Sequence, residues 1–420
     1  MAQIGNKTPE LFWGTVESHS KPKEIAASMH IKQKPEDFKV EELTNCQAGK
    51  VGDFAFYRLD KRGWTTPDAL QIVRKRWKIE VRRVSTGGLK DRHAETVQYL
   101  TIYRGPQRKL THPNLQLTYL GQVPEAYNSE RIDANRFAIT VRAMTDEQIG
   151  AALRALEEVI EVGVPNYYDD QRFGSVAHSG SFLAKQVILG EYEAAVQSAL
   201  TTPYAFQRTD QKKEKGILRQ HWGNWEYLRQ HLERGPALSI VEYLANHPDD
   251  FGGALERLPP ELRSLYLSAY QSHLWNHMLI NWLSDQVPRK DLTPVVLRLG
   301  EVPMPRRLDT DLNEMLHSFQ LPLHSARNQL EEDDPRKPYY DRILADEGLT
   351  LEQFKLKGFR NLFFSKGERA AWCFPQNLEA RNAKDEEHAR KQKLTLRFDL
   401  PRGSYATLVV KRITRVEEME

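Results

Sequence analysis

Thr86–Gln98 reads TGGLKDRHAETVQ and separates two stretches in which β-branched and aromatic residues recur. Those stretches, Ile79–Ser85 and Thr96–Tyr103, are predicted strands. The glycines between them predict a loop that carries Asp91. A carboxylate on a Gly-rich loop between strands is well placed to meet a ligand. The same residue type next to glycine also commonly builds turns, so Asp91 alone leaves both interpretations open.

Outward from this loop, strands and helices alternate through the first 165 residues. Phe38–Val40 and Phe137–Arg142 are predicted strands. A helix should begin with Thr66 as N-cap and Pro67 in its first turn. A second helix should follow the capping box formed by Thr145 and Gln148 and end at Gly163. Its predicted apolar face consists of Ile149, Leu153, Leu156 and Ile160. The pattern predicts an α+β fold.

The region from about residue 175 to 360 has a different pattern, rich in predicted helix. Glu261–Leu283 should form a long buried helix, and 308–337 should be polar and irregular. Strand character is expected to return only near the end, where Leu394–Leu400 alternates apolar and polar residues. Ser404 should then cap a short final helix. We expect an N-terminal extension (1–30), one domain built from both chain ends (31–174 and 361–420), and an inserted domain (175–360).

Composition sets broad limits on the class of protein. The chain has 420 residues, of which 40% are hydrophobic and 28% charged, typical of a globular protein. We expect no membrane span, because no apolar run is long enough to cross a bilayer. The expected state is a cytoplasmic monomer. Two cysteines exclude a disulfide framework and a Cys-rich zinc site.

The net charge is only +3, but basic residues cluster locally. Val73–Arg83 reads VRKRWKIEVRR, and Arg208–Arg234 mixes basic residues with Trp222, Trp225 and Tyr227. Basic residues interleaved with aromatic ones suit a phosphate backbone with stacked bases. Each stretch could equally be a solvated helix face.

Six segments in chain order carry a more specific signal. They are KQKPEDFKV (Lys32–Val40), GLKDRHAETVQ (Gly88–Gln98), NRF (Asn135–Phe137), VPNYYDDQRFG (Val164–Gly174), SAYQSHLWN (Ser268–Asn276) and LPRGSYAT (Leu400–Thr407). Together they resemble the ordered motifs of the TruD family of pseudouridine synthases. The resemblance implies a mixed, largely antiparallel sheet with flanking helices, interrupted by a largely helical TruD-type inserted domain. It also implies an active site in a cleft between the two domains.

The resemblance also implies roles for individual residues. Asp91 matches the catalytic aspartate, which would act as nucleophile without a cofactor or metal. The positions that match the uridine pocket and its surroundings are Lys32, Phe38, Lys90, Asn135, Phe137 and Tyr405. Arg172 and Phe173 match a motif expected to contact RNA. Asn135 could orient the Asp91 carboxylate, and Lys32 or Lys90 would supply positive charge.

These roles suit the chemistry that the family performs. The enzyme breaks the glycosidic bond of a uridine, rotates the uracil and rejoins it through C5. The base must leave its stack, so an aromatic pocket is needed, and a carboxylate can act as a reversible covalent nucleophile. The implied substrate is tRNA at uridine 13 of the D-arm, with other RNAs as further candidates. The alternatives are a non-catalytic RNA-binding protein or an RNA chaperone on the same scaffold.

An aspartate pair, a tyrosine and two histidines also bear on these roles. Asp169–Asp170 stands where compact family members often have Gly, and two carboxylates also suit a glycosidase, although adjacent side chains generally diverge. Tyr405 stands where Phe is common, which adds a hydroxyl expected to be auxiliary. His273 and His277 have zincin-like spacing but lack the catalytic Glu, so packing is the expected role.

Overall fold

The structure is a computed structural model that describes residues 29–176, 180–202, 209–359 and 362–415. Nearly all of the predicted N-terminal extension lies outside these residues. The first described element is β1 (His30–Ile31), which pairs with β8.

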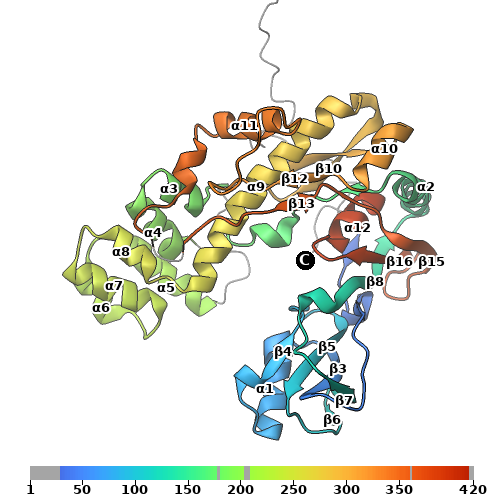
Figure 1. Cartoon of the computed structure of the whole chain (residues 1–420), viewed down its shortest axis with the longest axis horizontal. Coiled ribbons are helices and arrows are strands. Elements are labelled where there is room, and N and C mark those ends of the chain that lie inside the picture. Colours follow the sequence, from blue (N-terminus) through green and yellow to red (C-terminus); the bar gives the residue numbers. More distant parts are fainter. Residues whose placement is uncertain (1–28, 177–179, 203–208, 360–361, 416–420) are drawn as a thin grey trace, which may run out of the picture.

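A ten-stranded mixed sheet forms the centre of the fold (Figure 1). Its main path runs β15 (Gln376–Lys384), β16 (Gln392–Pro401), β8 (Ile132–Met144), β2 (Phe38–Thr44), β5 (Glu95–Tyr103), β3 (Phe54–Arg62), β7 (Leu115–Val123) and β6 (Leu110–His112). Off this path, β4 (Val84–Thr86) pairs with β5. Only β2 and β5 run parallel, so the predicted mixed, largely antiparallel sheet is confirmed. Both chain ends build it, because β16 pairs with β8.

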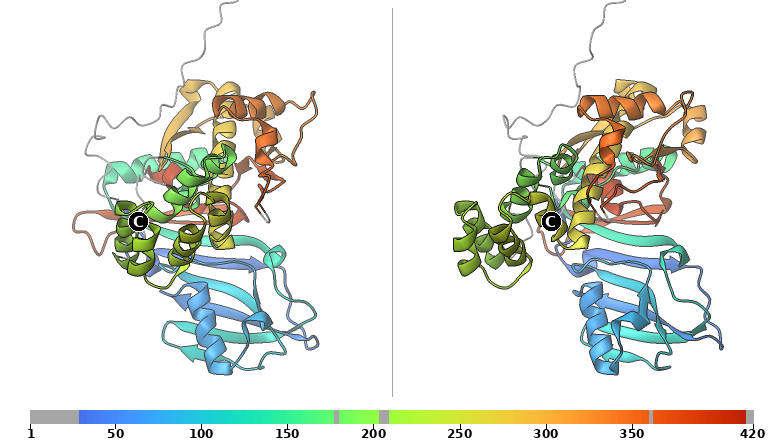
Figure 2. Two further views of the ribbon diagram at one scale, coloured as in Figure 1. Left: turned by 90° about the vertical axis from the view of Figure 1, so that its left-hand side faces the viewer. Right: turned by 60° about the vertical axis from the view of Figure 1, so that its left-hand side comes forward.

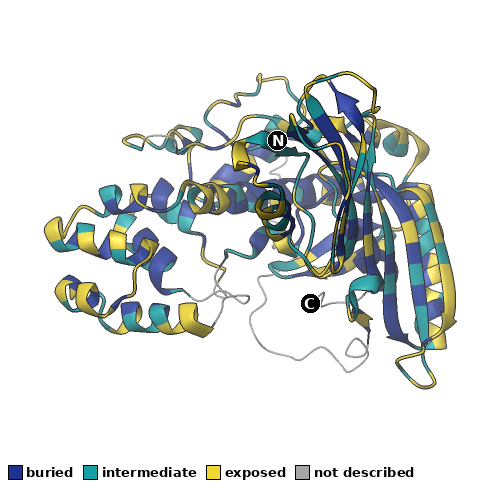
Figure 3. Cartoon of the chain, turned by 90° about the horizontal axis from the view of Figure 1, so that it is seen from below, coloured by how far each residue is buried: buried dark blue, intermediate teal, exposed yellow. Residues whose placement is uncertain are grey.

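Three helices cover one face of this sheet in two separate groups. α1 (Thr66–Trp77) packs Ala69 and Val73 onto β3, β5 and β7. α2 (Asp146–Val162) and α12 (Ala406–Thr414) pack on β8 and β16. The two groups bury two different hydrophobic clusters, and a seam of polar side chains lies between them. Viewed from below, buried residues gather between the sheet and its helices (Figure 3).

The local signals placed the starts of α1, α2 and α12 and the end of α2 to within one residue. The capping box of Thr145 and Gln148 is present, and Gly163 ends α2. The N-cap of α1 is Thr65 rather than Thr66, since the Thr65 hydroxyl accepts a bond from the backbone N–H of Asp68. α12 begins after Tyr405, not Ser404.

Two other expectations from the sequence were wrong in part. The buried face of α2 consists of Ile149, Ala152, Ala155, Val159 and Val162. Leu153 and Ile160, predicted to be inside, are 37% and 56% exposed. Of the predicted strand 79–85 only the end is strand, because Val81–Arg83 forms a 3-10 turn.

The middle of the chain is largely helical, as predicted. Its helices are α3 (Leu183–Ile188), α4 (Tyr192–Thr201), α5 (Thr209–Gln220), α6 (Trp225–His231), α7 (Pro236–Asn246), α8 (Phe251–Glu256), α9 (Pro260–Gln286), α10 (Thr310–Leu316) and α11 (Lys337–Asp346). α4 to α8 form a lobe that stands away from the sheet (Figures 1 and 2). The long buried helix predicted at 261–283 is confirmed as α9, which carries Trp275 and Leu279 at full burial.

Strands in this region contradict the prediction that strand character returns only near the end. β10 (Leu292–Leu297) and β11 (Gly300–Pro305) form a hairpin. β12 (Gln320–Pro322) pairs with β13 (Glu368–Ala370). Residues 308–337, predicted to be irregular, therefore contain a helix, α10, and a strand, β12. β14 (Trp372–Cys373) pairs with β9 (Val164–Pro165). None of the helices in the described ranges is long and apolar enough to cross a bilayer.

Candidate active site

The loop 87–94 crosses the polar seam between the two helix groups. Gly87 packs closely there, since an added Cβ would lie 2.5 Å from Ile132 Cδ1 and the Ile132 side chain would have to shift. The strand positions that face the loop are polar although they point inward. They include Glu42 on β2, Lys61 on β3 and Gln98 on β5, all at most 3% exposed. Such buried polar groups need partners, and the loop supplies several of them.

Lys61 holds the backbone on which Asp91 stands. Its ammonium donates to the carbonyl oxygens of Asp91 at 2.8 Å, Trp64 at 2.8 Å and Lys90 at 3.2 Å. Burial lowers the pKa of Lys61 from 10.5 to about 8, although the nearby Asp91 charge opposes this. The loop is also tied to α1, because the Lys90 backbone N–H donates to the Thr66 hydroxyl at 3.0 Å.

The Asp91 carboxylate meets side chains from two distant segments. Lys32 Nζ lies 2.9 Å from Asp91 Oδ2, and both side chains are partly accessible, at 18% and 32%. Gln171 Nε2 donates to Asp91 Oδ1 at 3.4 Å. Gln171 belongs to the 3-10 turn η4 (Asp170–Phe173), which leads into the helical region. A partly accessible carboxylate with an ammonium on one oxygen is positioned to act as a nucleophile or base.

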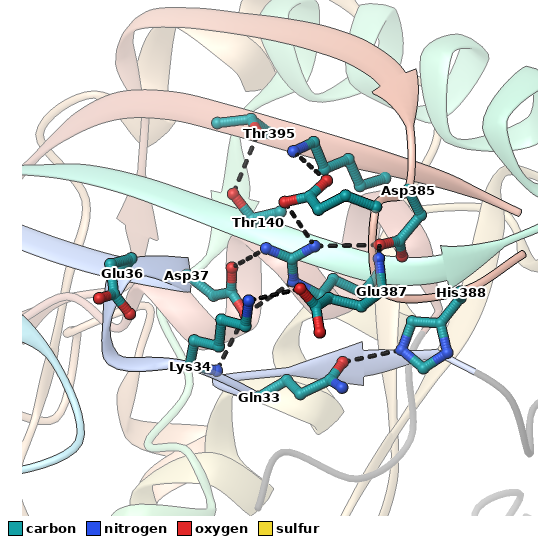
Figure 4. Close-up of polar contacts among 12 residues, drawn as sticks. Gln33, Lys34, Glu36, Asp37, Thr140, Asp385, Glu387, His388 and Thr395 are labelled. Atoms are coloured by element: carbon teal, nitrogen blue, oxygen red, sulfur yellow. Dashed lines mark hydrogen bonds and ion pairs between the residues drawn. The ribbon is translucent and has the colours of Figure 1, made fainter.

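A buried arginine, Arg142, holds the segment that follows Lys32, and Figure 4 labels its partners Asp37 and Asp385. Arg142 on β8 donates to both oxygens of Asp37 at 2.9 and 2.7 Å, and to Asp385 at 3.0 Å. Lys34 forms a further ion pair with Glu387. These contacts secure the chain that follows Lys32, and the pairing of β1 with β8 secures the chain before it; Lys32 itself has a left-handed φ of 59°.

Lys90 and Asn135 form a second polar group beside Asp91. Lys90 Nζ donates to Asn135 Oδ1 at 3.0 Å and lies 2.9 Å from Glu42 Oε1. The other Glu42 oxygen accepts from the Tyr99 backbone N–H at 2.9 Å. Asn135 therefore bonds Lys90 and not the Asp91 carboxylate that it was expected to orient.

Aromatic side chains line the same seam. Lys32 Nζ lies 4.1 Å from the centre of the Phe38 ring, and the Phe38 and Phe137 rings are 6.4 Å apart. Phe38 is only 4% exposed, whereas Phe137 is half-buried. Tyr405 lies in another aromatic group, with its ring centre 6.3 Å from that of Tyr168. The structure thus brings Lys32, Phe38 and Phe137 together and sets Tyr405 beside η4.

A cavity of about 630 Å³ lies mainly on the opposite face of the sheet, although Lys61 and Phe137 also line it. Asp91 does not line it. Its charged side chains pair across neighbouring strands, as in Lys39 with Glu95 at 2.8 Å and Arg136 with Asp399 at 2.9 Å. The arrangement is that of a solvated sheet face with neutralised charges, so we place the site at Asp91.

Comparisons with known proteins agree with this architecture. The family model of tRNA pseudouridine synthase D (TruD) matches residues 23–413. The probable tRNA pseudouridine synthase D 2 of Methanocaldococcus jannaschii is 32% identical over 92% of both chains. The tRNA pseudouridine synthase D of Aquifex aeolicus is 30% identical over 92% of this chain and 98% of its own. The chain belongs to the TruD family. A TruD crystal structure from Methanosarcina mazei shares the fold, with a TM-score of 0.71, 24% identity and coverage of 93% of this chain and 94% of that one.

Asp169 and Asp170, unusual before this TruD motif, have a structural partner. The Lys411 ammonium, fully buried on α12, lies 3.1 Å from Asp169 and 2.6 Å from Asp170. Thr407 also donates to Asp169. Both carboxylates are therefore engaged in fixing η4, which removes support for a glycosidase pair.

Two histidines and one tryptophan of this TruD chain serve packing. His273 stacks on Phe182 with ring centres 4.6 Å apart and lies 4.3 Å from the His277 ring. Burial lowers the pKa of both histidines. In the described part of the chain, no group of three or more His, Cys, Asp or Glu side chains is placed to hold a metal ion. Trp225 is buried in the core of the helical lobe, so its place in a basic stretch is no sign of base stacking.

Sequence reasoning missed the functional positions of Lys61 and Glu42. A signal for both was present in the strand alternation. Lys61 continues the inward series Tyr57 and Leu59, and Glu42 continues the series of Phe38 and Val40. A charged residue at an inward strand position requires a buried partner, and here the partners surround the Asp91 loop.

Proposed function

We propose that this chain isomerises a uridine of tRNA to pseudouridine, with Asp91 as nucleophile. The observation that carries the proposal is the setting of Asp91. Its carboxylate is paired with Lys32 and its carbonyl is held by Lys61, on a loop that faces a second segment through Gln171. Rigid support of a reacting group from several elements is what precise catalysis requires.

The reaction needs no external oxidant or reductant. The C1′–N1 bond of uridine breaks, the uracil turns, and a C1′–C5 bond forms; C5 loses its proton and N1 gains one, so the product is an isomer of the substrate. A carboxylate such as Asp91 can bond reversibly to the sugar or the base and be released when the new bond forms. Lys32 would keep one carboxylate oxygen oriented throughout, because it contacts Oδ2 directly.

We further propose that the aromatic side chains hold the extruded base. Phe137 is the more accessible of the pair on the sheet, and Phe38 backs it with an edge-on contact. Tyr405 would approach from the side of α12. Bases taken out of a stack are held between aromatic and apolar side chains. Arg172, Phe173, Lys90 and Asn135 complete the proposed surroundings of the nucleotide.

A basic surface supports RNA as the substrate. The C-terminal end of α1 and the turn after it expose Lys75, Arg76, Lys78 and Arg82, and the loop between β5 and β6 adds Arg104, Arg108 and Lys109. Arg83 joins these segments by donating to the carbonyl of Arg104 at 2.8 Å. The surface begins at Lys75, about 14 Å along α1 from Thr66, whose hydroxyl accepts from the backbone of the Asp91 loop. A polyanion spanning both places would gain affinity from this charge.

The test compares wild type with Asp91→Ala on unmodified tRNA transcripts, mapping each pseudouridine to its position. We expect product at uridine 13 of the D-arm, and a fall in turnover of at least roughly 10⁴-fold in the variant. Asp249→Ala is the control, because Asp249 is an exposed carboxylate in the helical lobe. Product in neither sample, with RNA binding intact in both, would favour the non-catalytic binder. A phenotype rescued by Asp91→Ala would favour the chaperone.

The division of the chain is part of this proposal. Residues 31–174 and 361–420 would form the catalytic domain and 175–360 the inserted one. The two would close over tRNA as a monomer, in the cytoplasm. Deleting the lobe of α4 to α8 should reduce tRNA affinity more than it reduces turnover of bound substrate.

A further inference from the structure

Two arginines from distant segments, Arg172 of η4 and Arg369 of β13, lie over the ring of one tyrosine. Tyr168 lies against both of them. The Arg369 guanidinium carbon is 4.1 Å from the Tyr168 ring centre, and that of Arg172 is 5.2 Å from it. Arg369 also lies 5.8 Å from the ring centre of Tyr405. We call Arg172 and Arg369 the arginine pair.

The hydrogen-bond partners of the arginine pair are neutral. Arg369 Nη2 donates to the carbonyl oxygen of Asn166 at 2.8 Å and to its side-chain oxygen at 3.0 Å. Arg172 Nη1 makes a long 3.4 Å contact with the Ser268 hydroxyl. Arg172 Nε is buried without a partner. Throughout the described ranges, no ion pair joins either arginine to a carboxylate.

Arg142 and Arg412, the fully buried arginines among the described residues, are neutralised, whereas Arg172 and Arg369 are partly buried and have no counter-ion there. Arg142 is bound by Asp37 and Asp385, and Arg412 lies 2.6 Å from Glu158. Burying a cation without a counter-ion is costly, and placing two cations together adds repulsion. Burial lowers the pKa of Arg369, and the charge of Arg172 lowers it further. The arginine pair is therefore built for an anion that arrives from outside the chain.

We propose that the arginine pair binds one phosphodiester group of RNA, next to the nucleotide that reaches Asp91. This inference rests on the proposed function. Arg172 directly follows Gln171, which bonds the Asp91 carboxylate, so an anion held here lies beside the proposed reaction site. Guanidinium groups suit phosphate because their planar N–H groups bond two oxygens at once. The bound phosphate would set the register of the strand and thereby choose which base enters the pocket.

The test measures tRNA affinity against salt concentration for Arg369→Gln and Arg172→Gln, in an Asp91→Asn background that prevents turnover. We expect each variant to bind roughly five- to tenfold more weakly and to lower the slope of log K against log salt by about 0.7. Arg369→Lys should keep most of the slope because it keeps the charge. Arg342→Gln, at an exposed arginine of α11, is the control and should leave the slope unchanged.

A second measurement identifies the phosphate. A set of transcripts is made, each with one neutral methylphosphonate linkage at a different position around the target uridine. Each transcript is titrated against the Asp91→Asn protein with Arg369 intact and against the same protein with Arg369→Gln. At one linkage, neutralisation should weaken binding to the otherwise intact protein but have no further effect on Arg369→Gln. Equal losses at every linkage, or an unchanged salt slope in folded variants, would overturn the inference.

The two proposals fail in different ways. If wild type neither binds nor modifies tRNA, the proposed function fails. If wild type modifies tRNA while Arg369→Gln keeps the full salt slope, only the arginine pair loses its proposed role. Thermal melting of each variant shows whether loss of the Asn166 contacts has unfolded the protein. If Arg369→Gln is unfolded, Arg369→Lys replaces it in the test, and its tRNA affinity should lie below that of the protein with Arg369 intact.

Discussion

Lys61→Met should destabilise the protein by about 2 kcal/mol at pH 7 and reduce turnover far more than binding. The two 2.8 Å bonds from the ammonium to backbone carbonyls are worth about 2 kcal/mol each, and the 3.2 Å bond about 1. Burial of the ammonium, which lowers the pKa of Lys61 from 10.5 to about 8, costs about 3 kcal/mol of the stability that these three bonds contribute. Methionine has a similar length, so it fills the space but leaves the three carbonyls without their donor.

The effect on activity follows from what those carbonyls belong to. Two of them are in Lys90 and Asp91, so the variant releases the backbone of the catalytic loop. A shift of about 1 Å in a reacting group can reduce kcat by about 10²-fold. Because the proposed tRNA-binding surfaces are unchanged, Kd should stay close to that of wild type. Single-turnover kinetics and a binding titration separate the two effects.

Stability should also depend on pH in a defined direction. Lys61 loses its proton near pH 8 in the native state and near 10.5 in the unfolded chain. Between these values the unfolded chain binds more protons, so wild type gains stability relative to Lys61→Met as pH rises. Lys39→Met is the control, because Lys39 is exposed on the opposite face. If Lys61→Met were as stable and as active as Lys39→Met, our account of the loop would be wrong.

Three further outcomes are expected. Arg142→Met leaves Asp37 and Asp385 buried without their partner, and should cost about 3–5 kcal/mol in urea unfolding; a loss below 1 kcal/mol would contradict this. Burial lowers the pKa of His324 to about 4, so stability should fall as pH drops from 6.5 towards 4, and His324→Phe should flatten that dependence. Tyr405→Phe should retain turnover within about threefold, since only the ring is assigned a role; loss of activity in a folded variant would show that the hydroxyl takes part.

Much of the fold was predictable because the relevant signals are local. Caps and alternation depend on neighbouring residues, and they placed α2, α9 and β16 to within a few residues. The inward face of α2 was not predictable from its large residues. Ala152 and Ala155 face inward because α12 approaches closely there, and that helix lies some 250 residues further along the chain. The β10–β11 hairpin was missed because prolines interrupt its alternation.

The site was predictable where a motif keeps its residues together in sequence. Asp91 and Lys90 fall in one such motif, and resemblance supplied their proposed roles. Arg172 falls in another such motif, whereas Arg369 had no comparable signal, because the side chains around it come from η4 and the segment before it and meet only in the folded chain. Arg369 stands in a short strand with no apolar period, so nothing local distinguishes it from a surface arginine.

The polar seam explains why these residues gather at one place. A sheet face covered by two separate helix groups has a strip between them that neither hydrophobic cluster fills. Inward strand positions along that strip carry Glu42, Lys61 and Gln98, each paired with the loop or the backbone around it. A sheet needed only for stability would place apolar residues there, because buried polar groups add little net stability even when fully paired. The strip is polar because it must hold one loop in one position, and the carboxylate on that loop is Asp91.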